Sequence, residues 1–163
     1  MFSIRIASDD LTFSAGHFIT LESGQCEHLH GHSYRVMAEI HGPLDENQYV
    51  VDFVAARGML KTILVELDHQ VLLPAQHPVI HVSTGPKEVE VTFSDHRWVF
   101  PKENCLILPL ANTTTELLAE YIGRRLMAEL NAHTHAQLEC VRIELGEGTG
   151  FSATCELRTT LPK

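Results

Sequence analysis

Basic residues are scarce in this chain: 12 Lys and Arg stand against 21 Asp and Glu in 163 residues, for a formal net charge of -9. That balance disfavours general binding to nucleic acid or to anionic membranes, so we expect neither as a partner. The chain also lacks an apolar run of the ~20 residues that a membrane-spanning helix needs. The stretch Met1-Phe2-Ser3-Ile4-Arg5 has no signal-peptide pattern. These absences predict a cytoplasmic protein.

Closely spaced cysteine pairs are missing as well. The chain has 4 cysteines and no C-x-x-C motif, so we expect thiols in a reducing compartment. Three of them lie in apolar or strand-like stretches and are expected to be small buried hydrophobes; these are Cys105, Cys140 and Cys155. Cys26 is surrounded by histidines, which predicts a lowered thiol pKa.

The remaining composition is typical of a soluble globular protein, with 44% hydrophobic and 20% charged residues. The length favours a single domain over residues 1–163. Alternating apolar residues predict strands near 4–6, 11–19 and 30–40, and a last strand over 140–147. Helical spacing predicts one helix after an N-cap at Asp52 and a second from a capping box, Thr113-x-x-Glu116. The pattern as a whole predicts an α+β domain.

Residues 74–104 form an excursion between the two predicted helices. Three short β-rich stretches are found there, and Ser94-Asp95-His96-Arg97 is expected to turn the last two into a hairpin. The histidines of this region are scattered, so we expect them to face solvent; they are His77, His81 and His96.

Histidines concentrate in the stretch Cys26-Glu27-His28-Leu29-His30-Gly31-His32. His30 and His32 are two apart, so on a strand both side chains point to one face. His17 ends another strand-like stretch, and two neighbouring strands can aim all three imidazoles at one point. Three neutral imidazoles with an open fourth position are the ligand set of a catalytic zinc ion. A fourth imidazole would close the site, so His28 is expected outside the ligand set.

A zinc ion held in this way stabilises negative charge on a substrate oxygen. A Cys26 thiolate is then expected to take a proton from the adjacent carbon. Asp68-His69 is either a carboxylate-oriented base or a helix cap beside a surface ion. This set favours elimination, tautomerisation or retro-aldol cleavage next to a carbonyl. Peptide hydrolysis is disfavoured because the chain has no H-E-x-x-H motif.

Two further stretches have both a structural and a functional interpretation. Glu147 continues the apolar row of the strand over 140–147, and a carboxylate there must find a partner or face a binding site. The preference for Glu147 over Glu144 follows from strand alternation. The stretch Asn112-Thr113-Thr114-Thr115-Glu116 suits a helix start, and its hydroxyls can also line a pocket.

Taken together, these motifs resemble the 6-pyruvoyl-tetrahydropterin synthase / 6-carboxy-tetrahydropterin synthase family. The resemblance covers the chain except for residues 74–104. The matching parts are Phe13-Ser14-Ala15-Gly16-His17, Cys26-x3-His30-Gly31-His32, Val51-Asp52-Phe53, Leu67-Asp68-His69, Asn112-x-Thr114-Thr115-Glu116 and Leu145-Gly146-Glu147. The family implies the tunnelling fold (T-fold), a four-stranded antiparallel sheet with two helices on one face. It also implies homo-oligomers, trimers that usually stack as hexamers, with active sites at subunit interfaces.

The resemblance further implies a role for each site residue. His17, His30 and His32 would bind Zn2+. Cys26 would be the general base, working with Asp68 and His69 of the same subunit or of a neighbouring one. The pterin substrate would be anchored by Glu147 and held by three residues at the start of the second helix: Thr114, Thr115 and Glu116.

Three intervening residues between Cys26 and the H-G-H motif resemble the bacterial 6-carboxy-tetrahydropterin synthases of queuosine biosynthesis. That implies a zinc-dependent lyase converting 7,8-dihydroneopterin triphosphate to 6-carboxy-5,6,7,8-tetrahydropterin, with acetaldehyde and triphosphate released. Cys26 argues against members that carry glutamate instead and release a hydroxymethyl pterin. The alternatives are a 6-pyruvoyl-tetrahydropterin synthase, which only eliminates triphosphate, a non-catalytic metal- or pterin-binding paralogue, and a cupin-like barrel of nearly pure β-structure.

Overall fold

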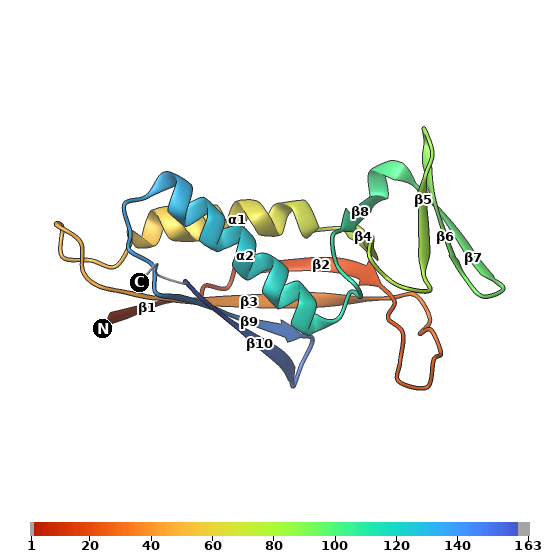
Figure 1. Ribbon diagram of the computed structural model, residues 1–163, viewed down its shortest axis with the longest axis horizontal. Coiled ribbons are helices and arrows are strands. Elements are labelled where there is room, and N and C mark those ends of the chain that lie inside the picture. The colour runs from red at the N-terminus through yellow and green to blue at the C-terminus, as the bar shows by residue number, and fades with distance from the viewer. Residues whose placement is uncertain (1, 160–163) are drawn as a thin grey trace.

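A mixed sheet and two helices on one of its faces make up most of the molecule (Figure 1). The structure is a computed structural model, and it describes residues 2–159. Within this range the sheet has seven strands, in the order β10-β9-β3-β2-β4-β8, with β1 paired to the far end of β3. The antiparallel strands are β1 (Phe2–Ile6), β2 (Thr12–His17), β3 (His30–Gly42), β9 (Cys140–Glu147) and β10 (Phe151–Arg158). Two parallel strands extend the β2 edge, β4 (Gln70–Pro74) and β8 (Cys105–Leu108).

The core lies between the sheet and the helices α1 (Phe53–Leu67) and α2 (Thr115–His133). The apolar stripe expected for the first helix is the buried face of α1, formed by Ala56, Leu60, Ile63, Leu64 and Leu67. Helix α2 packs closely on β9 and β10 at Gly123, where a Cβ atom would lie 2.9 Å from Leu157 Cδ1. The expected α+β class is confirmed. Helices of 15 and 19 residues exclude a cupin-like barrel.

One strand prediction was wrong, and two parallel strands were not predicted. The strand over 140–147 is not the last one, because β10 follows it and pairs along its whole length. Strand β10 has half-exposed, mostly small or polar residues, so its alternation is weak in the sequence. The parallel strands β4 and β8 were also missed, because short apolar runs carry no period that identifies a strand.

The capping box expected at Thr113 was wrong by one residue. The N-cap of α2 is Thr114, whose Oγ1 accepts from the Leu117 backbone N–H at 3.4 Å. Thr113 is buried instead, and its hydroxyl donates to the Phe18 carbonyl at 3.3 Å. The shift matters for function because it leaves the Thr113 backbone free to contact β2.

The excursion forms a second, three-stranded sheet at one end of the molecule (Figure 1). Its strands are β5 (His81–Thr84), β6 (Glu88–Phe93) and β7 (His96–Pro101), followed by a 3-10 turn, Lys102–Asn104. Its inner face packs with Phe18 and Leu73 into a second apolar cluster. Phe18 stacks on Trp98 with ring centroids 4.7 Å apart. This added sheet, residues 74–104, therefore touches the segment that directly follows His17.

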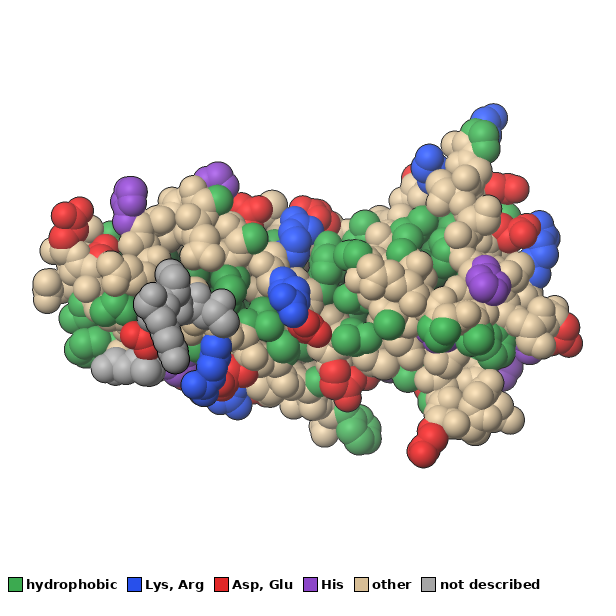
Figure 2. Space-filling view, viewed as in Figure 1, with side chains coloured by type: hydrophobic (Ala, Val, Ile, Leu, Met, Phe, Trp, Pro, Cys, Tyr) green, Lys and Arg blue, Asp and Glu red, His purple; other side chains and the backbone are tan. Residues whose placement is uncertain are grey.

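Surface charge on the face shown in Figure 2 is mixed, with small separate groups of Lys and Arg beside acidic side chains. Neither helix of the described region combines the length and the apolar character needed to cross a bilayer.

The start of α1 gives a direct test of the fold. The Asp52 carboxylate accepts from the backbone N–H groups of Val54 and Ala55 at 2.7 and 3.1 Å. We expect Asp52→Ala to lower the free energy of unfolding by about 1 kcal/mol, because those two N–H groups lose their acceptor. Urea denaturation measures this, and Asp52→Asn, which keeps the acceptor, is expected to stay close to the wild type. Equal stability of all three proteins would contradict the cap.

Candidate active site

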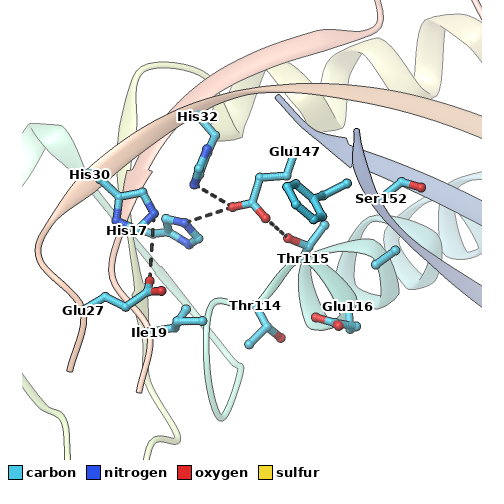
Figure 3. A pocket seen from close by; sticks show the side chains of 12 residues that line it. His17, Ile19, Glu27, His30, His32, Thr114, Thr115, Glu116, Glu147 and Ser152 are labelled. Atoms are coloured by element: carbon cyan, nitrogen blue, oxygen red, sulfur yellow. Dashed lines mark hydrogen bonds and ion pairs between the residues drawn. The ribbon is translucent and has the colours of Figure 1, made fainter. Parts of the chain in front are cut away.

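Three imidazoles converge where β2 ends and β3 begins (Figure 3). His17 and His30 are direct cross-strand partners in the antiparallel register, and His32 lies two residues further along β3. The ring centroids of His17, His30 and His32 lie 4.7 to 5.2 Å apart. The structure therefore brings together all three histidines that the sequence predicts as metal ligands. His28 is exposed and lies outside this group.

Backbone carbonyls orient two of the three rings. His17 Nδ1 lies 2.8 Å from the Thr113 carbonyl, and His30 Nδ1 lies 2.8 Å from the His28 carbonyl. A carbonyl only accepts, so each Nδ1 carries the proton and each Nε2 presents a lone pair. Burial lowers the pKa of His17, which favours the neutral ring that a metal requires. A carbonyl behind a histidine is a common way to hold a metal ligand in place.

Glu147 reaches the same point from the end of β9. Its Oε1 lies 2.7 Å from His32 Nε2 and 3.4 Å from His17 Nε2, and its Oε2 accepts from the Thr115 hydroxyl at 2.7 Å. Sequence reasoning assigned this carboxylate to substrate binding. The structure adds that it lies among the imidazoles, where it can also serve as a fourth metal ligand.

The donor set fits a zinc ion. One atom from each of His17, His30, His32 and Glu147 lies within 4.8 Å of all the others. Zinc binds imidazole nitrogen and carboxylate oxygen at about 2.0–2.2 Å, so the widest pair needs to move together slightly. Nitrogen donors with one carboxylate also suit zinc better than magnesium or calcium, which prefer oxygen.

A pocket of about 550 Å³ opens beside this cluster. The start of α2 forms one wall with Thr114, Thr115 and Glu116, the residues assigned from the sequence to substrate binding. The residues that line the pocket from the sheet and the preceding loop are His17, Ile19, Glu27, His30, His32, Glu147, Phe151, Ser152 and Ala153. The pocket thus joins the imidazole cluster to polar side chains that can hydrogen-bond a ligand.

Cys26 does not line this pocket. Its side chain packs against the second apolar cluster, between the main sheet and the added sheet. Burial there, and then the charge of Glu27, raise the pKa of the Cys26 thiol. The expectation of a lowered thiol pKa was therefore wrong. The neighbouring histidines do not surround the sulfur, because the chain turns it away from them.

Glu27 faces the pocket instead, and sequence reasoning missed it. Its Oε2 lies 3.9 Å from His30 Nε2 (Figure 3). Cys26 forms an isolated β-bridge with Thr20, and the Glu27 N–H bonds the Ile19 carbonyl. In an extended segment neighbouring side chains point to opposite sides, so packing of Cys26 against the second apolar cluster places Glu27 on the pocket side. The signal in the sequence that could have identified Glu27 is its spacing, because it lies three residues before the metal-ligand candidate His30.

Asp68 and His69 form a pair outside this pocket. Asp68 Oδ2 lies 2.9 Å from His69 Nδ1, and its Oδ1 accepts from the Ser14 N–H at 2.8 Å. These hydrogen bonds lower the pKa of Asp68 and keep it ionised. The His69 side chain is 83% exposed and has a positive φ of 58°, which is strained for a residue other than glycine. The single chain therefore holds a carboxylate-oriented imidazole that faces outward.

Comparison with known proteins identifies the family to which this histidine-lined pocket belongs. A model of the 6-pyruvoyl tetrahydropterin synthase family matches residues 7–158. The chain belongs to this family. The expectation of a tetrahydropterin synthase-type enzyme is confirmed at that level.

Two curated relatives and one solved structure describe the similarity. A Methanocaldococcus jannaschii protein named as a candidate 6-carboxy-5,6,7,8-tetrahydropterin synthase is 28% identical over 144 residues, which is 88% of each chain. The Haemophilus influenzae 6-carboxy-5,6,7,8-tetrahydropterin synthase is 27% identical, over 73% of this chain and 79% of that one. A Plasmodium vivax 6-pyruvoyltetrahydropterin synthase has a TM-score of 0.88 at 25% identity, and the match covers 97% of this chain and 98% of that one. The expected T-fold is thereby confirmed, although the sheet of the described residues has seven strands, two of them parallel, and not the four antiparallel strands expected.

Proposed function

We propose that this chain is a zinc-dependent lyase that converts 7,8-dihydroneopterin triphosphate to 6-carboxy-5,6,7,8-tetrahydropterin. The observation that carries the proposal is the pocket in which three oriented imidazoles lie beside Glu147 and Thr115. The names of the curated relatives support the 6-carboxy product. Bound zinc would polarise a substrate oxygen and stabilise negative charge on it.

The protein groups around that oxygen would have two further roles: holding the substrate ring and removing a proton. The start of α2 and Glu147 would hold the ring, with the carboxylate accepting from ring N–H groups and the threonine hydroxyls completing the contacts. A base must then remove a proton from the carbon next to the polarised oxygen. Two residues in the loop between β2 and β3 are candidates, Cys26 from its sequence motif and Glu27 from its position.

Glu27 is the better placed base in the single chain. Its carboxylate lines the pocket, whereas the Cys26 thiol lies in an apolar cluster that raises its pKa. A carboxylate base is compatible with this fold, because a glutamate is named as the catalytic residue of the Plasmodium vivax protein. Glu27 also favours a second candidate function, release of a hydroxymethyl pterin, which the presence of Cys26 had argued against.

We further propose that the active enzyme is a homo-oligomer, a trimer or hexamer whose sites lie between subunits. The Asp68–His69 pair supports this, because it has the geometry of a base and yet lies apart from its own pocket. An exposed imidazole at that position is available to a neighbouring copy, where it would assist proton transfer. The protein would act in the cytoplasm, and queuosine biosynthesis is the pathway that fits the 6-carboxy product.

A product assay tests the proposal. Zinc-loaded protein is incubated with 7,8-dihydroneopterin triphosphate, and pterins are identified by mass spectrometry. We expect 6-carboxy-5,6,7,8-tetrahydropterin together with acetaldehyde. A 6-pyruvoyl product would mean that only triphosphate is eliminated, and a 6-hydroxymethyl product would support the second candidate. Intact substrate would overturn both and leave a non-catalytic binding protein.

A further inference from the structure

The loop that carries Cys26 and Glu27 is tied to the added sheet by one side chain. His77 lies where the chain leaves β4 for the added sheet, and its Nε2 is 2.9 Å from Thr20 Oγ1. Thr20 opens the loop between β2 and β3 and bridges to Cys26. The expectation that His77 faces solvent was therefore wrong: the residue is partly buried and hydrogen-bonded on both ring nitrogens.

The protonation of His77 follows from its neighbours. Its Nδ1 accepts from the backbone N–H groups of Val79 and Ile80, at 3.1 and 2.9 Å. Backbone amides only donate, so Nδ1 must be unprotonated and the proton of the neutral ring must sit on Nε2. The contact to Thr20 is consequently an Nε2–H donor to a hydroxyl acceptor, with a fixed direction.

The contact between His77 and Thr20 belongs to a continuous series of hydrogen bonds that ends at the imidazole cluster. Asn112 Nδ2 donates to Thr20 Oγ1 at 3.3 Å, and Asn112 Oδ1 accepts from the Thr113 N–H at 3.0 Å. The Thr113 carbonyl in turn accepts from His17 Nδ1 at 2.8 Å. This series of hydrogen bonds therefore connects the added sheet, the Cys26–Glu27 loop, the start of α2 and the buried imidazole of His17.

We propose that His77 is a positioning residue for the active site, acting through its hydrogen bond to Thr20 to hold the loop that carries Cys26 and Glu27. The added sheet then has a role in the reaction, because it supplies the fixed point on which this loop rests. The stacking of Phe18 on Trp98 brings the same two regions together by apolar contact. The hydrogen bond adds direction, which an apolar contact lacks. The inference rests on the proposed function only for its kinetic readout.

Two variants, called the link variants, each remove one partner of the hydrogen bond between His77 and Thr20. Thr20→Val keeps the shape and removes the acceptor. In His77→Asn the amide oxygen still accepts from the Val79 and Ile80 N–H groups, as asparagine commonly does two and three residues ahead, but the shorter side chain does not reach Thr20. His81→Asn is the matched control, the same substitution at an exposed position of the added sheet.

Hydrogen exchange over residues 19–29 and steady-state kinetics are measured on the wild type, Thr20→Val, His77→Asn, the double variant of these two, and the control His81→Asn. We expect both link variants to exchange about tenfold faster in this segment, the equivalent of one hydrogen bond. Their kcat is expected to fall at least about threefold while KM changes less than about twofold, because the base is misplaced and not the ring contacts. The double variant should be no worse than either single one.

Wild-type exchange in both link variants would overturn the inference, and so would faster exchange with unchanged kcat. A matching loss in His81→Asn would also overturn it, since that result would reflect general loosening of the added sheet. If the wild type shows no turnover, the proposed function fails by itself, and the exchange measurement still decides whether His77 holds the loop.

Discussion

Replacing His30 with alanine is expected to lower zinc affinity by more than about 100-fold and to abolish turnover. Groups that only orient a zinc ligand are typically worth 10–100-fold, so loss of a ligand should cost more. His30 is suited to the test because its side chain is 37% exposed, so truncation leaves the core intact. Competition with a chromophoric chelator measures the affinity, and circular dichroism checks the fold.

His28→Ala is the matched control. His28 contributes its backbone carbonyl, which holds His30 Nδ1, while its own ring is exposed and outside the cluster. We expect zinc affinity and turnover within about twofold of the wild type, since the carbonyl remains. If both variants lost zinc equally, the loss would reflect a general disturbance of the loop, and His30 would not be established as a ligand.

Replacing Glu27 with glutamine is expected to lower kcat by about 10²–10⁴-fold, the usual worth of a general base. Glutamine keeps the size of the side chain and its contact to the pocket but cannot take a proton. Cys26→Ala is expected to have a smaller effect, because the thiol lies in the second apolar cluster and burial raises its pKa. Single-turnover kinetics on the zinc-loaded proteins separate the chemical step from product release.

The two variants also discriminate between the bases. If Cys26→Ala showed the larger loss and Glu27→Gln stayed near the wild type, the base predicted from the sequence motif would be right, and assembly would have to turn its thiol toward the pocket. A Glu27→Gln protein that retained zinc and full rate would remove the carboxylate from the mechanism.

The histidine cluster could be predicted because it depends on local rules. His30 and His32 alternate on one strand, and the antiparallel pairing of β2 with β3 brings His17 opposite them. The N-cap at Asp52 and the stripe of α1 follow from equally local signals. Glu147 was found by strand parity, although its place among the imidazoles depends on how β9 pairs with β3.

Other features depend on contacts that no local pattern encodes. Glu27 faces the pocket because the added sheet gives Cys26 an apolar surface to pack against, and that surface is built from residues far along the chain. In the sequence His77 is one of several scattered histidines, and only the tertiary fold places it against Thr20. Strand β10 was missed because its pairing, and not its own polarity, defines it.

Zinc K-edge X-ray absorption on the reconstituted protein tests the central claim most directly. The account predicts one zinc per chain, coordinated by three imidazole nitrogens at about 2.0–2.1 Å with light-atom ligands completing the shell. A protein that binds no zinc, or a zinc spectrum dominated by sulfur at about 2.3 Å, would contradict it.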